Sequence, residues 1–253
     1  AEVTEVLPDD EAAAFCQAYA TTESGNFEHG WTNPVLASST HATREALAGA
    51  RAKLREAREH RGRPGRDDKA LLGWNALALR GLAEAALALG NAAWLERATA
   101  LAETMLTAFR SADGGWHNVR YGEQARGTAK LDDLAFFAEA LLVLAGAGDQ
   151  LDPARTKRFR EAAEALADHA LTDFRDPHQA GFFYAAETQS DLAVRKKDWM
   201  DNAIPAGMSS LLHVFGVLYS LSGDSRYAQE IDVLRPAYVG LCQRAPTAIA
   251  HAL

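Results

Sequence analysis

Three stretches of the sequence are apolar on nearly every side of the helices that they predict. They read LLGWNALALRGLAEAALAL at 71–89, LAFFAEALLVLAGA at 134–147 and MSSLLHVFGVLYSL at 208–221. Apolar and small residues recur at helical spacing in each, and their helix propensity is high. A helix that lacks a polar face must be surrounded by other elements, because its apolar side chains would otherwise face water. The three stretches are therefore expected in the interior of one fold.

Each apolar stretch is followed by an amphipathic stretch rich in Arg and Glu, which can cover it from outside. The predicted pairs are 68–89 with 92–109, 132–146 with 153–173, and 204–222 with 224–243. Cap residues mark the helix starts, and glycines mark the helix ends. The caps are Asp9 or Asp10, Thr40, Asn91, Asp152 and Asp224, and the glycines are Gly90, Gly146 or Gly148, and Gly223.

A weak internal repeat supports the pairing. FRSADGGWHNV follows the first pair and FRDPHQAGFFYA follows the second, and each joins a Phe-Arg helix end to a Gly-aromatic stretch suited to a short strand. Equivalent apolar helices recur about every 65 to 70 residues. The sequence thus predicts an all-α fold, an α/α toroid of paired helices with short β-hairpin loops, in which all the inner helices run parallel.

Charged residues stand at the start of each predicted inner helix. The chain has six lysines, and four of them fall in these three places. If the inner helices are parallel, these charges converge on one rim of the toroid. The residues concerned are Asp67, Asp68 and Lys69, then Lys130, Asp132 and Asp133, then Lys196, Lys197, Asp198 and Asp201.

Carboxylates that converge in this way are suited to acid and base catalysis, which needs one protonated and one ionised carboxyl. Nearby aromatic side chains could stack on sugar rings. These are Trp31, Trp74, Trp116, Phe182, Phe183 and Trp199. A structural interpretation competes with this one. An aspartate in the first turn of a helix is more often a cap than a catalyst, and an aromatic side chain is more often part of the core.

Composition and motifs exclude several classes of function. The formal net charge of −8 argues against nucleic acid or an anionic membrane surface as a partner. The two cysteines, Cys16 and Cys242, form no CxxC motif, and no stretch resembles a signal peptide or a membrane span. A cytoplasmic location is expected. The eight histidines form no HExxH motif, so neither a metal site nor a cofactor is predicted.

Six motifs together resemble the helical part of the thioredoxin-domain-containing, spermatogenesis-associated protein 20 family. They match in order and spacing across nearly the whole chain. The motifs are GNFE at 25–28, RPGRDDKALLGWNALAL at 63–79, GGWHNVR at 114–120, KLDDLAFF at 130–137, GFFYAAE at 181–187 and RKKDWMDNAIPAG at 195–207.

This resemblance implies a six-hairpin (α/α)6 barrel similar to those of N-acylglucosamine 2-epimerase and the six-hairpin glycosidases. Six hairpins need about 400 residues at the observed spacing, so residues 1–253 are expected to form a single toroid domain that is an incomplete barrel. The expected partners are the remaining hairpins and the thioredoxin-like domain that precedes the barrel in this family. Self-association is the alternative way to cover the open edge of the barrel.

The family's polar rim, carried over by motif, divides into two sets. We interpret Asp68, Asp133 and Asp198 as catalytic. The residues interpreted as substrate-binding are Asn26, Glu28, Asp67, Lys69, Trp74, Asn75, Asp132, Arg195, Lys197 and Asp201. The chain departs from the family where Leu134 replaces a tyrosine, and where Ala206 and Met208 replace polar residues.

Two functions follow from this resemblance. The first is a carbohydrate-active enzyme, an epimerase, isomerase or glycosidase, that acts on a small sugar. The second is a non-catalytic binding or scaffold domain that serves the thioredoxin-like domain. The apolar side chains of Leu134 and Met208 favour the second, because they remove hydrogen-bonding groups from the expected site.

Overall fold

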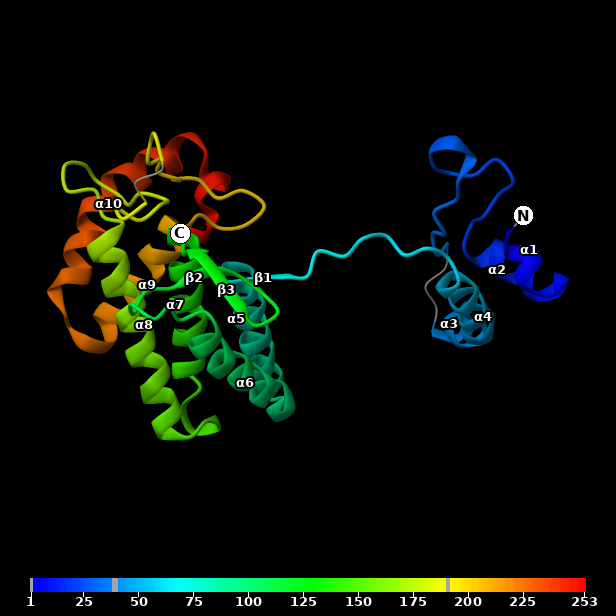
Figure 1. Ribbon diagram of the computed structural model, residues 1–253, viewed down its shortest axis with the longest axis horizontal. Coiled ribbons are helices and arrows are strands. Elements are labelled where there is room, and N and C mark those ends of the chain that lie inside the picture. The colour runs from blue at the N-terminus through cyan, green and yellow to red at the C-terminus, as the bar shows by residue number, and fades with distance from the viewer. Residues whose placement is uncertain (1, 38–40, 190–191) are drawn as a thin grey trace. The chain divides into compact units, whose positions relative to one another are not determined.

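The computed structural model describes residues 2–37, 41–189 and 192–253, and the chain divides into two compact units, 1–67 and 68–253 (Figure 1). The first unit has a small core of Leu7, Ala12, Phe15 and Ala50. Its elements are α1 (Glu2–Val6), α2 (Asp9–Ala18), the 3-10 helix η1 (Glu28–Gly30), α3 (His41–Ala46) and α4 (Ala48–Glu59).

The second unit contains three long helix pairs and a small sheet. The pairs are α5 (Leu72–Leu89) with α6 (Ala92–Ala108), α7 (Leu131–Ala145) with α8 (Pro153–Asp173), and α9 (Gly207–Ser222) with α10 (Ser225–Arg244). The strands are β1 (Lys69–Leu71), β2 (His117–Tyr121) and β3 (Gln124–Thr128), and the 3-10 helices are η2 (Gly148–Gln150) and η3 (Pro246–Ala252). None of the helices in the described ranges is long and apolar enough to cross a membrane.

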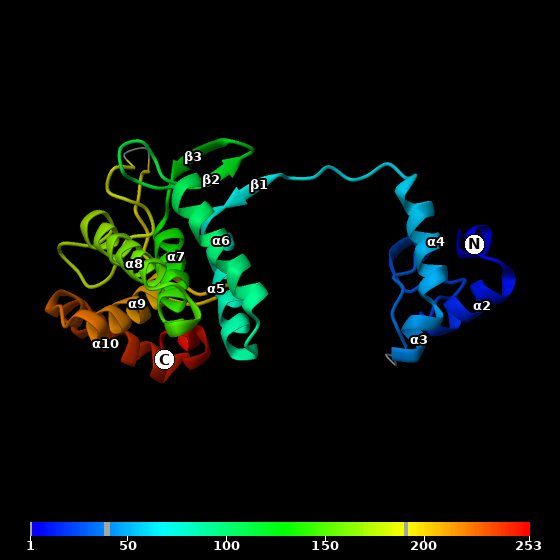
Figure 2. The same cartoon turned by 90° about the horizontal axis from the view of Figure 1, so that it is seen from below.

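The first helices of the pairs form an inner layer, in which α7 lies between α5 and α9 (Figures 1 and 2). Each second helix packs on its own inner helix, α6 on α5, α8 on α7 and α10 on α9. This arrangement confirms the predicted all-α toroid of paired helices.

The inner helix α7 is buried on every side, as its sequence predicts. Phe136, Phe137, Leu141 and Leu144 are at most 1% exposed, and even Glu139 is buried. The inner helices α5 and α9 keep some apolar side chains in solvent, such as Trp74 on α5 and Tyr219 on α9. Helix α7 is therefore the centre of the apolar core of this unit.

The first inner helix begins at Leu72 and not at residue 68, which corrects the predicted boundary. Residues Lys69–Leu71 instead form β1, which pairs antiparallel with β2 so that Lys69 lies opposite Tyr121. Asp67 and Asp68 consequently precede a strand and do not cap the helix. Local sequence did not reveal this, because the pairing partner lies about 50 residues further along the chain.

The two predicted Gly-aromatic strands differ in outcome. The first, at GGWHNV, contributes β2, which pairs with β3 through a turn at Gly122, where φ is +54°. The second, at GFFYA, forms isolated bridges between Arg175 and Phe182 and between Lys130 and Ala185 in the described part of the chain. One short β-hairpin is therefore confirmed, and the second expected strand is reduced to isolated bridges.

Three of the predicted N-caps are confirmed. Asn91 accepts from the backbone N–H of Trp94, Asp152 from those of Ala154 and Arg155, and Asp224 from that of Arg226. Asp9 and Asp10 lie inside the first turn of α2, whose N-cap is Pro8, so that prediction is wrong. Thr40 lies outside the described residues. Gly90 and Gly223 end α5 and α9 as predicted, and both adopt the left-handed conformation.

Candidate functional site

The first turn of α7 holds the starts of both neighbouring inner helices. Asp133 accepts the backbone N–H of Gly73 on α5 at 2.8 Å through Oδ1, and that of Lys130 at 2.8 Å through Oδ2. Asp132 accepts the backbone N–H of Gly207 on α9 at 2.9 Å through Oδ1. The N-terminal ends of α5, α7 and α9 therefore lie together, as the parallel arrangement requires.

Glycine is needed on both partner helices because the aspartates approach their backbone closely. A Cβ on Gly73 would lie 2.8 Å from Oδ1 of Asp133. A Cβ on Gly207 would lie 2.8 Å from the backbone nitrogen of Asp132 and 3.0 Å from its Cα. The two aspartates and two glycines thus form a matched contact between the helix starts.

Burial raises the pKa of both aspartates to about 6. For Asp132 the negative charges of Asp133 and Asp198 act in the same direction, and the bond from Gly207 opposes them. For Asp133 the backbone N–H groups of Lys130 and Gly73 oppose the effect of burial. Both carboxyls therefore change protonation state close to neutral pH, as general acids and bases often do.

Residues from the loop before α9 complete this group. Lys196 Nζ lies 2.8 Å from Oδ2 of Asp198 and 4.7 Å from the ring centre of Tyr184. Burial, followed by the charges of the three aspartates, raises the pKa of Tyr184 to about 12. We call this group the acidic cluster, which consists of Asp132, Asp133, Tyr184, Lys196 and Asp198.

The acidic cluster thus brings together Asp132, Asp133 and Asp198 from the predicted site. It also includes Tyr184, which the sequence reasoning missed. GFFYAAE was recognised as a motif, but only its phenylalanines were considered as aromatic groups. The phenol lies here because the backbone of Tyr184 pairs with both Leu131 and Lys196.

The other predicted residues of the loop before α9 make contacts within the protein. Arg195 donates to the backbone carbonyls of Asp173 and Ala185 and lies over the ring of Phe183. Lys197 Nζ lies 2.7 Å from Oδ2 of Asp176.

Asp201 accepts the backbone N–H groups of Ala206 and His251, both at 2.9 Å. Like the contacts of Arg195 and Lys197, these bonds hold the loop in place.

The remaining predicted residues lie around the start of α5 or in the first unit. Trp74 is 65% exposed, and Asn75 donates to the carbonyl of Leu71 at 2.8 Å. Lys69 lies in β1 and Asp68 directly precedes it. In the first unit Asn26 exchanges two hydrogen bonds with Asn33, Glu28 begins η1, and Asp67 is the last residue. A catalytic role for Asp68, and a role in substrate binding for the other residues, stay predictions.

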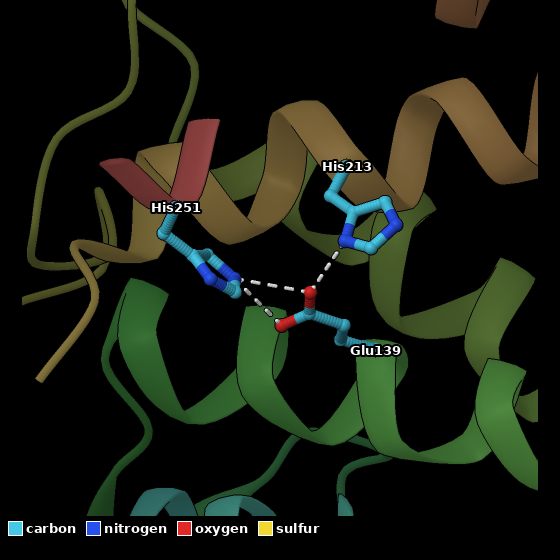
Figure 3. A group of neighbouring side chains, drawn as sticks. All are labelled: Glu139, His213 and His251. Carbon is cyan, nitrogen blue, oxygen red and sulfur yellow. Dashed lines mark hydrogen bonds and ion pairs between the residues drawn. The ribbon is translucent and has the colours of Figure 1, made fainter. Parts of the chain in front are cut away.

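A second group of titratable side chains lies further along the inner helices (Figure 3). Glu139 of α7 is buried and accepts from His213 Nδ1 of α9 at 2.7 Å and from His251 Nε2 of η3 at 3.0 Å. Arg80 Nη1 of α5 lies 2.8 Å from the same carboxylate. We call Arg80, Glu139, His213 and His251 the Glu-His cluster.

Electrostatics stabilises the ionised carboxylate of the Glu-His cluster. Burial alone would raise the pKa of Glu139, but the hydrogen bonds from His213 and His251 and the positive charges of His251 and Arg80 hold it at about 2. The bond to Glu139 raises the pKa of His213, and burial opposes it. The sequence alone did not predict this cluster, because His213 lies 74 residues and His251 lies 112 residues after Glu139, so the three form no local motif.

The solved structures that match this chain share its α/α toroid fold, and their names describe sugar-processing enzymes. An α-1,6-mannanase of Salegentibacter sp. is 12% identical with a TM-score of 0.53, over 94% of this chain and 70% of that chain. Cellobiose 2-epimerase of Spirochaeta thermophila is 19% identical with a TM-score of 0.50, over 72% of this chain and 46% of that chain. A family 76 mannosidase of Bacteroides thetaiotaomicron is 13% identical with a TM-score of 0.52, over 67% of this chain and 44% of that chain.

Among curated proteins the chain is homologous to spermatogenesis-associated protein 20. It is 28% identical to the mouse protein over 207 residues, which are 78% of this chain and 25% of that protein. It is also 28% identical to the human protein over 219 residues, 82% of this chain and 27% of that protein. The chain spans about a quarter of the length of these relatives. No family model matches it. The homology confirms the resemblance found from the motifs.

Proposed function

We propose that the chain is the α/α toroid part of a carbohydrate-active protein, in which the acidic cluster performs acid and base chemistry on a sugar. The observation that carries this proposal is the grouping of Asp132, Asp133 and Asp198 beside the starts of the parallel inner helices, with the pKa of two of them raised to about 6. A buried carboxyl with a raised pKa keeps its proton to a higher pH than a neighbouring carboxylate, so such a pair can supply one general acid and one base.

The hydrogen bonds assign different roles within the cluster. Asp133 uses both oxygens to hold backbone N–H groups, so it is best suited to a structural role. Asp132 uses Oδ1 for Gly207, which leaves Oδ2 as the atom that can give or take a proton. Asp198 forms an ion pair with Lys196. Asp132 would act as the acid and Asp198 as the base or nucleophile.

The likeness to sugar-processing enzymes supports this proposal. The mannanase structure is of a variant that is named inactive, in which two adjacent aspartates are replaced by asparagine, in complex with α-1,6-mannotriose. Asp132 and Asp133 are also adjacent. We propose that a mannose-containing oligosaccharide or a disaccharide is the class of substrate, and that the exposed ring of Trp74 stacks on it.

The test is to screen the full-length protein for turnover of α-1,6-mannotriose, cellobiose and N-acylglucosamine, with Asp132→Asn, Asp133→Asn and Asp198→Asn beside it. Asp132→Asn keeps an oxygen that can accept from Gly207, so it should fold and yet lose turnover by about 100-fold or more. Asp133→Asn should mainly lower the melting temperature. Absence of turnover in the unmodified protein, or full activity of both Asp132→Asn and Asp198→Asn, would reject the proposal.

A non-catalytic binding domain is the second candidate. It is favoured by the internal contacts that Arg195, Lys197 and Asp201 make, because groups committed to the fold are less free to act on a ligand. Calorimetry with the same sugars distinguishes the two functions. Binding without conversion would support this second function. The domain would then serve a partner such as a thioredoxin-like domain.

A further inference from the structure

The Glu-His cluster has the ligand types of a transition-metal site. The ligand atoms of Glu139, His213 and His251 all lie within 4.8 Å of one another. Two imidazole nitrogens and one carboxylate oxygen are donors that Zn²⁺, Co²⁺ and Ni²⁺ accept. The three side chains come from α7, α9 and η3, and Figure 3 shows both imidazoles directed at the carboxylate of Glu139.

The surroundings hold two of the ligands firmly and leave a path for an ion. Glu139 is 2% exposed on the buried helix α7. The backbone N–H of His251 donates to Asp201 Oδ2 at 2.9 Å, which fixes the position of η3. The side chain of His213 is 49% exposed, so an ion can reach the carboxylate past this imidazole.

Arg80 is the competitor for the same carboxylate. Its Nη1 lies 2.8 Å from Glu139 Oε1 and 3.3 Å from His251 Nε2, so an ion and the guanidinium cannot both hold these atoms. One helical turn further on, Glu84 Oε1 lies 2.7 Å from Arg80 Nε. The guanidinium can therefore keep one carboxylate partner when it leaves Glu139.

We propose that Glu139, His213 and His251 bind a divalent transition-metal ion, and that Arg80 competes with this ion for Glu139. The imidazoles bind as neutral ligands, and any protons that they share with Glu139 go to solvent. The two histidines and the carboxylate occupy three coordination positions, and water can fill the rest. This site is separate from the acidic cluster, so the proposal does not rest on the proposed sugar chemistry.

The experiment is calorimetric titration of the chelator-treated full-length protein with Zn²⁺, paired with the visible absorption of added Co²⁺. We expect one ion per chain and a Co²⁺ spectrum that reports nitrogen and oxygen ligands. Glu139→Gln, His213→Ala and His251→Ala should each weaken binding by more than about 10-fold. Arg80→Gln should tighten binding, because it removes the competing cation.

A matched control is His169→Ala on α8, because His169 Nε2 also faces a carboxylate, at 3.2 Å from Asp173 Oδ2, but lies outside the cluster. It should leave the affinity unchanged. If Glu139→Gln fails to fold, His213→Ala still tests the site, because a half-exposed side chain can be replaced with little effect on folding. The proposal is overturned if the natural protein binds no ion, if Arg80→Gln alone binds one, or if the three ligand variants bind as tightly as the natural protein.

Discussion

At the scale of single residues, the contact between aspartates and glycines joins the starts of the inner helices, and the pKa of both aspartates is raised there. Asp132 and Asp133 lie where two helix starts supply N–H donors, which favours the ionised carboxylate. Burial has the larger and opposite effect on the pKa of each. The two carboxyls with a raised pKa therefore also hold α7 to its neighbours.

Gly207→Ala should destabilise the protein by about 1–3 kcal/mol, because the added Cβ would meet the backbone of Asp132, which cannot move aside easily. Urea unfolding measures the change. Gly216→Ala on the same helix is the matched control, because among the described residues no atom beyond its chain neighbours and the nearby backbone of α9 lies within 4 Å of its added Cβ. It should be neutral or stabilise by up to about 1 kcal/mol. Equal effects of both substitutions would contradict the contact.

The raised pKa of Asp132 predicts how stability depends on pH. Between its usual value of 3.8 and about 6, the folded state holds a proton that the unfolded state has lost. The free energy of unfolding should therefore fall as the pH rises through this window, and level off above it. Asp132→Asn cannot ionise, so its stability relative to the natural protein should improve from pH 4 to pH 7. Urea unfolding at both values tests this, with the exposed Asp149→Asn as control, and a constant difference would contradict it.

At the scale of secondary-structure elements, local signals define where the paired helices begin and end. Asn91, Asp152 and Asp224 each cap the helix that the sequence predicts for them. The start of α5 is not set by a cap. The residues predicted to form its first turn instead form β1, which pairs with β2. Caps work within four residues, whereas strand pairing joins distant segments. This is why the first kind of boundary was predictable and the second was not.

Asp152→Ala should lower the free energy of unfolding by about 1 kcal/mol, because two N–H groups of α8 lose their acceptor. Chemical denaturation followed by circular dichroism provides the measurement. Asp149→Ala, an exposed change three residues earlier in η2, serves as the comparison and should have little effect. If the two variants lose the same stability, the cap is not the cause.

At the scale of the whole molecule, the second unit shows one buried inner helix and two that keep apolar side chains in solvent. A groove of about 360 Å³ on α9, α10 and the C-terminus is lined by apolar side chains that include Leu212, Ile231 and Val239. Exposed apolar surface of this kind is typical of a region that another chain or segment covers. In a longer protein, further hairpins of the barrel are the proposed cover.

We expect the 253-residue chain on its own to self-associate through this groove. Val239→Lys should shift the chain toward monomer, because Val239 is 51% exposed and lines the groove. Sedimentation equilibrium at several concentrations measures the change. Val194→Lys adds the same charge at an exposed valine outside the groove and should have no effect. A natural chain that stays monomeric at all concentrations would contradict this expectation.

The sequence by itself determined the helix pairing, most helix boundaries, the layer of apolar helices and the family resemblance. The first three follow from periodicity and capping, which act over a few residues, and the resemblance rests on six motifs in their order along the chain. Only the tertiary structure decided which charged groups meet. Asp132, Asp133 and Asp198 come together while Arg195, Lys197 and Asp201 turn to protein partners, and Glu139 meets His213 and His251 across three elements. Such contacts depend on how each helix is rotated and where η3 folds back, and neither is encoded in a local pattern.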